Sequence, residues 1–441
     1  MKCDILNLEW GSSGRDIHIV EPVLSYIEIK FGLNVVRESI WHGELKLLKY
    51  RPKVLLISNS TGATNNFRIV KLAHLIGIKT VALISEGDIV EKADYINKMF
   101  WGWNTDKKSY EDLTIFWTER TVQLAKKNIP ESAGFNLKYS GATGFDRYKL
   151  FSFSSKEEFK EKLNKDIYKK VIGLAGWGFD LYSEETLQKS LAPLPDECYY
   201  FIDFYNKSRK ELNNVYKQLV ENNPDILFVA KFHPGTVDRN CTEFEGLSNF
   251  PNVVELFREE ISDIINACDI WIAFESTTCL EAWLLGKQTF LINPCGENFP
   301  RSLIYKGSPV YFNYERSQKA INDFYEIGNI PAFLEKEDER ERLIKYTIEH
   351  GDGKNHQRAA DFVFELFKDS RKKKKTIDLF VLKTLTKALV KWVLYHTPLK
   401  YTVYKYYKLH EYTKNTYYSS FERGKISDLY RIKLKEFHNI L

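Results

Sequence analysis

A cation, an imidazole and a sharp turn stand together in one short motif of the sequence. Lys231 and His233 are separated by a single phenylalanine and follow an apolar run, so in a strand both side chains point to the same side. Pro234 and Gly235 then turn the chain. An ammonium and an imidazole at the end of a strand can hold a phosphate. The alternative is a strand-ending turn that carries a surface histidine.

A run of hydroxyl side chains, Ser276, Thr277 and Thr278, follows Glu275 and precedes an apolar helical segment. One hydroxyl is enough to cap a helix, and capping is the structural explanation for the run. Three hydroxyls exceed that need, and the free N–H groups and the dipole of a helix start favour anions. Glu281 lies one turn into the helix on the same side as Thr277 and Thr278. Its carboxylate could accept hydrogen bonds from ribose hydroxyls.

Two carboxylates, Glu86 and Asp88, surround a glycine at the end of another apolar run. A general base must be exposed to its substrate and held by rigid backbone, and a strand end offers both. Glu86 is the first choice for such a base and Asp88 the second. The alternative for Asp88 is a cap on the following helix. The segment Asn59–Gly62 ends a further strand and is another candidate for the same side of the site.

A loop rich in glycine and serine follows the first apolar run of the chain. Gly11, Ser12, Ser13 and Arg15 stand between that run and a helical segment, which is where a phosphate-binding loop would lie. The loop lacks the G-x-G-x-x-G spacing and the Walker lysine. It is predicted to contact a phosphate or an acceptor substrate, and the alternative is a flexible turn with a capping serine.

The elements that position these motifs are short apolar runs alternating with amphipathic helices. Such a pattern predicts parallel sheets covered on both faces. It restarts after a stretch at 141–156 that contains Gly, Ser and Thr, so we expect two Rossmann-like, doubly wound α/β domains facing a cleft. Ligands of such sheets bind beyond the carboxyl ends of the strands. The predicted boundaries are 1–150 and 151–368 for the domains and 369–441 for a basic helical tail.

The motifs of the second domain, taken together, resemble the donor half of several bacterial GT-B glycosyltransferase families. The shared pattern is K-x-H-P and then, after about 40 residues, [E/D]-S-x-x-x-x-E-A-x-x-x-G-K, here Glu275 to Lys287. The families include sialyltransferase-like and Kdo-transferase-like enzymes, wall-teichoic polyol-phosphate transferases and surface carbohydrate biosynthesis proteins. The resemblance covers roughly Lys170–Pro294. It departs from the E-x7-E pattern of many retaining enzymes, because Trp283 stands eight places after Glu275, which leaves the stereochemistry open.

The resemblance implies a role for each motif. His233 and Ser276–Thr278 would contact the donor phosphate, and the second domain would bind a nucleotide-sugar. The Glu86-Gly87-Asp88 segment is similar to the acidic-acidic-Gly element of His-Pro-motif sialyltransferases, with the order changed. The first domain would therefore hold the acceptor and supply the base.

The composition limits the possible partners. The net charge is +5, but residues 369–441 hold 17 Lys and Arg against 6 Asp and Glu, and the rest of the chain holds 47 against 53. A mildly acidic body does not favour nucleic-acid binding. The histidines are dispersed and no metal-binding motif is present, which predicts a metal-independent transferase without a cofactor. Six scattered cysteines without a C-x-x-C pair suit a reducing cytoplasm, and we expect no signal peptide and no transmembrane helix.

The tail combines cations with aromatic residues. Five cations at 371–375 precede a helical pattern at 377–395, in which Lys383, Lys387 and Lys391 form a basic stripe. Tyrosines and lysines make up most of 401–408. This composition is typical of a helix lying in a headgroup layer, so we predict attachment to a membrane surface through 371–408. The alternatives are a helix packed on the body or an oligomer contact, and RNA binding.

The sequence thus predicts a glycosyltransferase at the inner face of the cell membrane. It would pass a sugar from a nucleotide-sugar, with a slight preference for a CMP-linked acidic sugar, to a lipid-linked or polysaccharide acceptor in surface glycan synthesis. Two enzymes of the same architecture remain as alternatives, a UDP-sugar 2-epimerase and a CDP-polyol phosphotransferase. A nucleotide-sensing or scaffold protein is the non-enzymatic alternative.

Overall fold

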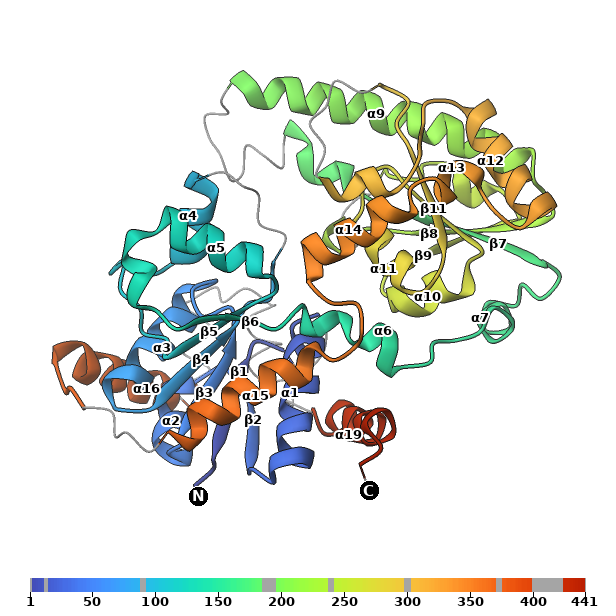
Figure 1. Ribbon diagram of the computed structural model, residues 1–441. Coiled ribbons are helices and arrows are strands. Elements are labelled where there is room, and N and C mark those ends of the chain that lie inside the picture. Colours follow the sequence, from blue (N-terminus) through green and yellow to red (C-terminus); the bar gives the residue numbers. More distant parts are fainter. Residues whose placement is uncertain are drawn as a thin grey trace. The chain divides into compact units, whose positions relative to one another are not determined.

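The chain folds into two compact units, each with its own sheet. The computed structural model describes residues 2–11, 15–87, 93–184, 196–236, 242–296, 303–369, 375–398 and 423–440. Unit 1 comprises Met1–Phe151 and Lys345–Leu441, and unit 2 comprises Ser152–Ile344 (Figure 1).

Unit 1 is built on a parallel six-stranded sheet of strand order β2-β1-β3-β4-β5-β6. Alternate strand residues face opposite sides, so each face is buried under helices. One face packs on α1, α15 and α19, and the other packs on α2, α3 and α16. The strands are β1 (Ile5–Glu9), β2 (Val35–Ser39), β3 (Val54–Ser58), β4 (Lys79–Leu83), β5 (Leu113–Phe116) and β6 (Leu137–Tyr139). The helices are α1 (Arg15–Phe31), α2 (Gly43–Tyr50), α3 (Thr64–Leu75), α4 (Ala93–Trp101), α5 (Glu119–Asn128), α6 (Arg147–Leu150), α15 (Asn355–Lys368), α16 (Leu379–His396) and α19 (Gly424–His438).

Unit 2 repeats the architecture with the strand order β12-β11-β10-β7-β8-β9. Gly173 in β7 lies against the Trp271 ring of the adjacent β10, where a Cβ would approach the ring to 2.2 Å, so only glycine fits. The strands are β7 (Lys170–Ala175), β8 (Ile226–Lys231), β9 (Val253–Leu256), β10 (Ile270–Ala273), β11 (Gln288–Ile292) and β12 (Val310–Tyr311). The helices are α7 (Lys156–Lys162), α9 (Asp196–Glu221), α10 (Ile261–Ala267), α11 (Thr278–Leu284), α12 (Tyr314–Ile327), α13 (Pro331–Leu334) and α14 (Glu337–Ile348), the last of which ends in unit 1.

The predicted domain boundaries differ from these units at the C-terminal end. The second domain was predicted to run to 368 and the tail to be separate. In the structure, α15 packs on α1, and its residues Ala359, Ala360 and Val363 enter the core of unit 1. The chain therefore returns to unit 1 before α15, because that sheet face needs a further apolar helix to cover it.

Both described helices of the predicted tail also belong to unit 1. Helix α19 packs on α1, and α16 packs on α2 and α3. A helix packed on the body was the alternative prediction for the tail, and such packing explains why the inner side of each helix is buried. Residues 370–374 and 399–422, which include most of the cation run and the tyrosine-rich stretch, lie outside the described residues.

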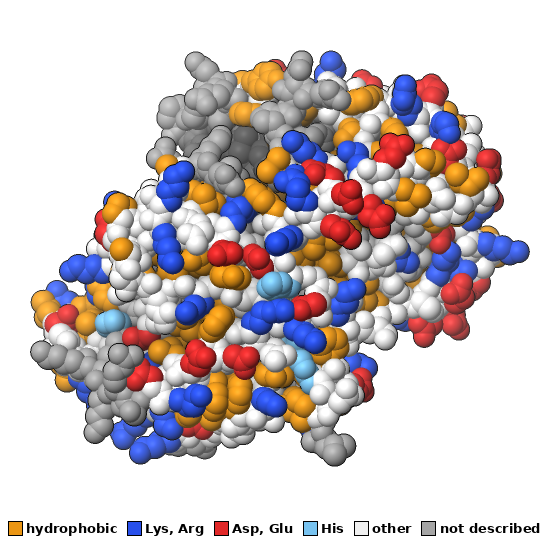
Figure 2. Space-filling view, viewed as in Figure 1, with side chains coloured by type: hydrophobic (Ala, Val, Ile, Leu, Met, Phe, Trp, Pro, Cys, Tyr) orange, Lys and Arg blue, Asp and Glu red, His pale blue; other side chains and the backbone are white. Residues whose placement is uncertain are grey.

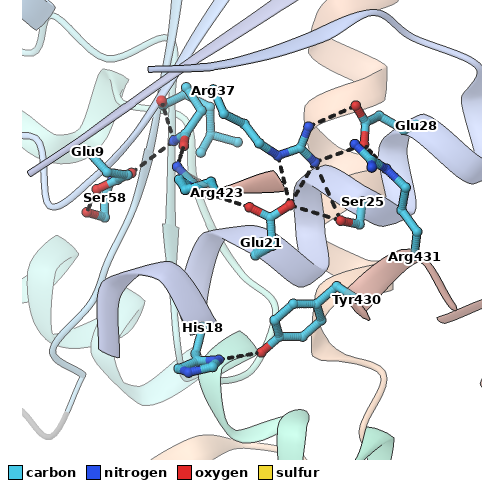
Figure 3. Close-up of polar contacts among 12 residues, drawn as sticks. Glu9, His18, Glu21, Ser25, Glu28, Arg37, Ser58, Arg423, Tyr430 and Arg431 are labelled. Carbon is cyan, nitrogen blue, oxygen red and sulfur yellow. Dashed lines mark hydrogen bonds and ion pairs between the residues drawn. The ribbon is translucent and has the colours of Figure 1, made fainter. Parts of the chain in front are cut away.

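A buried ion network fixes α19 to the N-terminal part of the chain (Figure 3). Arg423 donates to Asn7 Oδ1 at 2.5 Å and to Glu21 Oε2 at 2.6 Å. Glu21 also accepts from Arg37 Nε at 2.8 Å. Burial alone would raise the pKa of Glu21, but Arg37 and Arg423 together lower it. The carboxylate is therefore charged and fully paired, as a buried ion must be to be tolerated.

Charges of both signs are interspersed on the face of the molecule seen in Figure 2. Such mixing is ordinary for a protein surface and differs from the single-signed stripe of a typical nucleic-acid site. The expectation that the protein does not bind nucleic acid stays a prediction.

Candidate functional site

Three adjacent strands of unit 2 bring the motifs of the second domain together. In the order β10-β7-β8, the carboxyl ends of the strands lie side by side. Ser276 follows β10, and His233 follows β8. Between them, β7 ends in the turn Gly176–Gly178, and the Trp177 ring packs edge-on against Phe274 with centroids 5.6 Å apart. Polar groups from three loops thus gather at one edge of the sheet, the usual place for a ligand in this class of sheet.

His233 is held in a defined orientation by two glycines. Its Nδ1 accepts a hydrogen bond from the Gly235 amide at 3.1 Å. A Cβ on Gly178, which has a φ of 82°, or on Gly235 would approach the imidazole to 3.1 Å. Because Nδ1 is an acceptor, the proton of the neutral ring lies on Nε2. Burial and the nearby Lys231 charge lower the pKa of His233, so near neutral pH the ring presents one N–H donor and no charge.

A buried glutamate holds the turn after β7 against His233. Glu243 accepts from the amide of Trp177 at 2.5 Å and from the amide of Gly178 at 3.2 Å. Its side chain is almost wholly buried, and burial raises its pKa to about 7 in spite of these donors. A Cβ on Gly176 would lie 2.6 Å from the His233 amide nitrogen and 2.9 Å from Glu243 Oε2. The turn, the histidine and the glutamate therefore form one closely packed unit.

Lys231 was predicted to act together with His233, but its ammonium binds backbone carbonyl groups instead. Its Nζ donates to the backbone oxygens of Phe232 at 3.0 Å and Phe257 at 2.8 Å, and the residue is only 7% exposed. The carbonyl groups at the ends of β8 and β9 bind the ammonium. Its charge still acts on the His233 ring through space. Pro234 and Gly235 form the predicted turn after the strand.

Two of the three predicted hydroxyls have structural partners. Thr278 Oγ1 accepts from Trp271 Nε1 at 2.9 Å and lies 2.7 Å from Ser276 Oγ. The Ser276 hydroxyl also accepts from the Thr278 amide at 3.3 Å. These local hydrogen bonds account for Ser276 and Thr278, whereas the N-cap residue of α11 is Thr277, whose side chain makes no capping hydrogen bond. Thr277 is exposed at the start of α11, and Glu275 is buried beside it, whereas Glu281 is half-buried.

An aromatic wall stands beside the turn of β7. The Trp177 ring packs on Tyr205 of α9 at a centroid distance of 4.4 Å and an interplanar angle of 35°. Phe179 packs on Trp177 and on Phe274, each at 5.0 Å. Trp177 is nevertheless only half-buried. A half-buried indole next to an imidazole donor offers a flat surface on which a ring could stack.

Unit 1 has a separate pocket at the carboxyl ends of β3, β4 and β5, which are also adjacent in their sheet. The pocket encloses about 660 Å³, part of it open to solvent. Its polar wall contains Asn59, Ser60, Thr61, Glu86 and Glu111, and its apolar wall comes mainly from α4, α5 and β5. The structure thus brings together two of the predicted elements, Asn59–Gly62 and Glu86.

The polar wall of this pocket is internally ordered. Ser60 Oγ donates to Glu111 Oε1 at 2.5 Å. Asn104 is 3% exposed and donates through Nδ2 to the Lys108 carbonyl at 2.8 Å, while its Oδ1 has no hydrogen-bond partner among the described residues. A buried amide oxygen without a donor is costly.

Glu86 is exposed on the rim of the pocket, and the residue after it fixes its position. A Cβ on Gly87 would lie 2.2 Å from the Trp117 ring, so only glycine fits, and Trp117 Nε1 donates to the Ile84 carbonyl at 2.8 Å. Asp88, the second choice for the base, lies outside the described residues. Of the predicted phosphate loop, Gly11 is described, whereas Ser12, Ser13 and the side chain of Arg15 lie outside the described residues.

The sequence reasoning missed several residues of both sites. It did not select the Gly176-Trp177-Gly178 turn, although two glycines around a tryptophan directly after a strand are a recognisable signal of a tight loop. It could not select Glu243, Asn104 or Glu111, because a single carboxylate or amide in a loop has no distinguishing spacing. Among the described residues, no group of three or more metal-ligating side chains comes together. No helix in the described ranges is long and apolar enough to span a bilayer.

Comparison with known proteins shows the fold. No protein-family model and no curated protein matches the chain. The structure of S. aureus MnaA with UDP matches at 11% identity and a TM-score of 0.52, covering 86% of this chain and all of that one. A putative UDP-N-acetylglucosamine 2-epimerase from Listeria monocytogenes matches at 11% identity and a TM-score of 0.54 with the same coverage. The wall teichoic acid polymerase TagF, soaked with CDPG, matches at 12% identity and a TM-score of 0.52 over 83% of this chain and 89% of its own.

These matches show the fold of the chain. The chain has the GT-B fold, with two Rossmann-like domains built on parallel six-stranded sheets, as predicted from the sequence. The solved structures that share the fold include enzymes that act on nucleotide-linked substrates.

Proposed function

We propose that the protein is a glycosyltransferase that takes a sugar from a nucleotide-sugar donor bound to unit 2. The His233 ring would donate its Nε2–H to a donor phosphate, and the exposed Thr277 would add a hydroxyl at the start of α11. Trp177 would stack on a ring of the ligand. The UDP and CDPG complexes named for proteins of the same fold support a nucleotide donor.

The acceptor would bind to unit 1, and Glu86 would act as the general base. The base takes the proton of an acceptor hydroxyl, the hydroxyl oxygen bonds to the anomeric carbon, and the bond from that carbon to the donor phosphate breaks. The nucleotide then leaves with the electron pair of the broken bond. A preorganised N–H donor and a helix start stabilise the negative charge that develops on it. The proposed reaction needs neither a metal nor a cofactor, so removal of divalent cations with EDTA should leave the rate unchanged.

The observation that carries this proposal is the pocket at β3–β5 of unit 1. It belongs to a different sheet from the His233 group and has an exposed carboxylate on its rim. A two-substrate enzyme needs a second binding place of this kind. We propose a lipid-linked or polysaccharide acceptor of surface glycan synthesis at the inner face of the cell membrane, and a CMP-linked acidic sugar remains the slight preference for the donor.

A UDP-sugar 2-epimerase is the second candidate, because the Listeria protein covered over its whole length has that putative activity. A CDP-polyol phosphotransferase would follow from the likeness to TagF. An epimerase converts UDP-N-acetylglucosamine without an acceptor. Incubation of the protein with that compound alone, followed by chromatography of the sugar, separates the epimerase from either transferase.

The first test is thermal stabilisation by CMP, CDP, UDP, GDP and their sugars. A ligand that binds only the folded state adds about 2.7 kcal/mol to the free energy of unfolding when its concentration is 100 times its dissociation constant. We expect one nucleotide class to raise the melting temperature of the wild type. The increase should disappear in His233→Ala and also in His233→Asn, since asparagine can still accept from the Gly235 amide but has no donor at the Nε2 position.

The matched control is His350→Ala, which removes a partly buried histidine of unit 1. This variant should keep the full nucleotide-dependent shift. If no nucleotide stabilises the wild type, or if the His233 variants respond like the wild type, the donor site proposed in unit 2 is wrong.

A further inference from the structure

Helix α16 of unit 1 presents two different sides. Its inner side packs on α2 and α3, where Val381, Thr384 and Ala388 are buried. Asp378 caps the helix by accepting from the Val381 amide at 2.9 Å. Helix α16 is thus anchored to unit 1 by its inner side, to which the partly buried Phe380 and Leu385 also contribute. Figure 1 shows the helix at the edge of that unit beside α3.

The other side, which we call the outer face of α16, is apolar and exposed. It consists of Leu379, Leu382, Leu389, Val390, Trp392 and Val393, which are between 38% and 63% exposed. Leu382, Leu389 and Val393 follow each other at intervals of seven and four residues, so they share one side of the helix. A contiguous group of large exposed apolar side chains marks a surface that meets another apolar phase or partner.

Three lysines run along the edge of this outer face. Lys383, Lys387 and Lys391 are exposed and four residues apart, and Lys383 and Lys391 each stand next to an exposed apolar residue in the sequence. The sequence of α16 contains no Asp or Glu. Apolar side chains, a tryptophan and a one-signed row of flexible cations together match the interfacial layer of an anionic bilayer, where the cations reach phosphate groups.

We propose that the outer face of α16 docks on the surface of an anionic lipid bilayer. The apolar side chains enter the headgroup boundary, and the three lysines bind lipid phosphates beside them. Only the purpose of this docking, which is to bring the enzyme to a lipid-linked acceptor, rests on the proposed function. Binding to a bilayer needs no turnover and no nucleotide, so it can be tested separately from the reaction.

The test is co-sedimentation of the full chain with vesicles of phosphatidylcholine alone or mixed with phosphatidylglycerol. We expect binding to the mixed vesicles, weaker binding to the neutral ones, and a decrease with added salt. Leu389→Glu should weaken binding on the order of tenfold or more, because it removes an inserted side chain and adds a repelled charge. Replacing Lys383, Lys387 and Lys391 by Gln should weaken it on the order of 100-fold, since each cation near the surface contributes about 1 kcal/mol.

Matched variants control for general changes in charge and polarity. Ile327→Glu alters an equally exposed apolar residue of α12, and Gln at Lys107, Lys126 and Lys127 removes the same charge elsewhere in unit 1. Both controls should bind like the wild type, and all variants should melt like it, since the altered side chains are exposed.

Three outcomes would overturn the proposal. The wild type could fail to bind the mixed vesicles, or the control variants could lose as much binding as the α16 variants. The protein could also form a dimer in size-exclusion chromatography that Leu389→Glu dissociates, which would assign the outer face to a second copy of the chain. A failed nucleotide test with intact vesicle binding would reject the proposed function and leave the docking surface standing.

Discussion

Glu9 of unit 1 and Glu243 of unit 2 are both buried beside the carboxyl ends of central strands, but the two carboxylates have different surroundings. Glu9 ends β1 in unit 1, and its partners are Ser58, through both the amide and the hydroxyl, and Asn7 Nδ2 at 2.9 Å. Glu243 in unit 2 accepts from the amides of the turn Gly176–Gly178. Burial raises the pKa of both to about 7. One glutamate therefore joins strands within a core, and the other shapes a loop beside an imidazole.

The difference teaches that burial and a raised pKa do not identify a functional carboxylate. Glu9 is closed in by strands and by the ion network around Arg423, so a substrate has no access to it. Glu243 is equally buried, yet the amides that it binds belong to the turn against which His233 packs. Its effect on a ligand would be indirect, through the position of that turn.

The largest effect is expected on the unit 1 side of this comparison. Arg423→Ala removes one of the two cations that pair with Glu21 and leaves a buried carboxylate with one partner fewer, which costs about 3–5 kcal/mol. Calorimetric unfolding should show a large decrease in stability. Arg431→Ala, which alters a partly exposed pair with Glu28, should cost less than about 1 kcal/mol. Equal effects of the two variants would show that the buried pair is not what holds α19.

The second effect is a pH dependence that both glutamates share. Each carboxyl has a pKa of about 7 in the folded protein and an ordinary pKa of 4.5 in the unfolded chain. Between these pH values the folded protein holds a proton that the unfolded chain has released. The free energy of unfolding is therefore highest below about pH 4.5 and decreases as the pH rises to about 7, by roughly 3 kcal/mol for each group. Denaturation across that window should show falling stability. Glu9→Gln should reduce the slope, and an unchanged slope would mean that Glu9 is ionised throughout.

The smallest effect on stability separates the two carboxylates by function. Glu243→Gln replaces one of two acceptor oxygens with a donor that faces amide N–H groups, which costs about 1–3 kcal/mol. The turn after β7 should shift, so nucleotide binding should weaken by about tenfold, as measured by titration calorimetry on the folded protein. Glu9→Gln should leave nucleotide affinity unchanged. Equal losses of affinity in both variants would contradict the division between a structural and a positioning glutamate.

Much of the fold follows from local patterns, and most of the site geometry does not. The apolar run before His233 was predicted to be a strand, and the structure confirms it as β8, Ile226–Lys231. Short apolar runs that alternate with amphipathic helices are typical of a parallel sheet. The eight-residue helix α2 and the two-residue strand β12 were missed, since neither is long enough to show a period. His233 was selected by its motif, and its role in binding a ligand stays a prediction. Lys231 was misplaced, because alternation fixes the side of a strand but not which carbonyl groups will bind an ammonium.

Contacts between distant parts of the sequence were beyond prediction from one chain. Arg423 and Asn7 are 416 residues apart, and nothing in either segment names the other as its partner. The basic tail was interpreted mainly from its charge and its aromatic residues. In the structure its described part contains α19, which completes the core of unit 1, and α16, which has an exposed apolar face.

Unit 1 is assembled from two segments of the chain, one before unit 2 and one after it. During synthesis, Glu21 and the apolar face of α1 are made early and must wait for α15, Arg423 and α19, while unit 2 can fold from continuous sequence. A ribosome that stalls within unit 2 therefore leaves a nascent chain with an uncovered sheet face and a carboxylate that lacks one of its cations. Chaperones and proteases act on such chains. Synthesis of unit 1 begins first but its core is completed last, so unit 1 is the last to be protected from them.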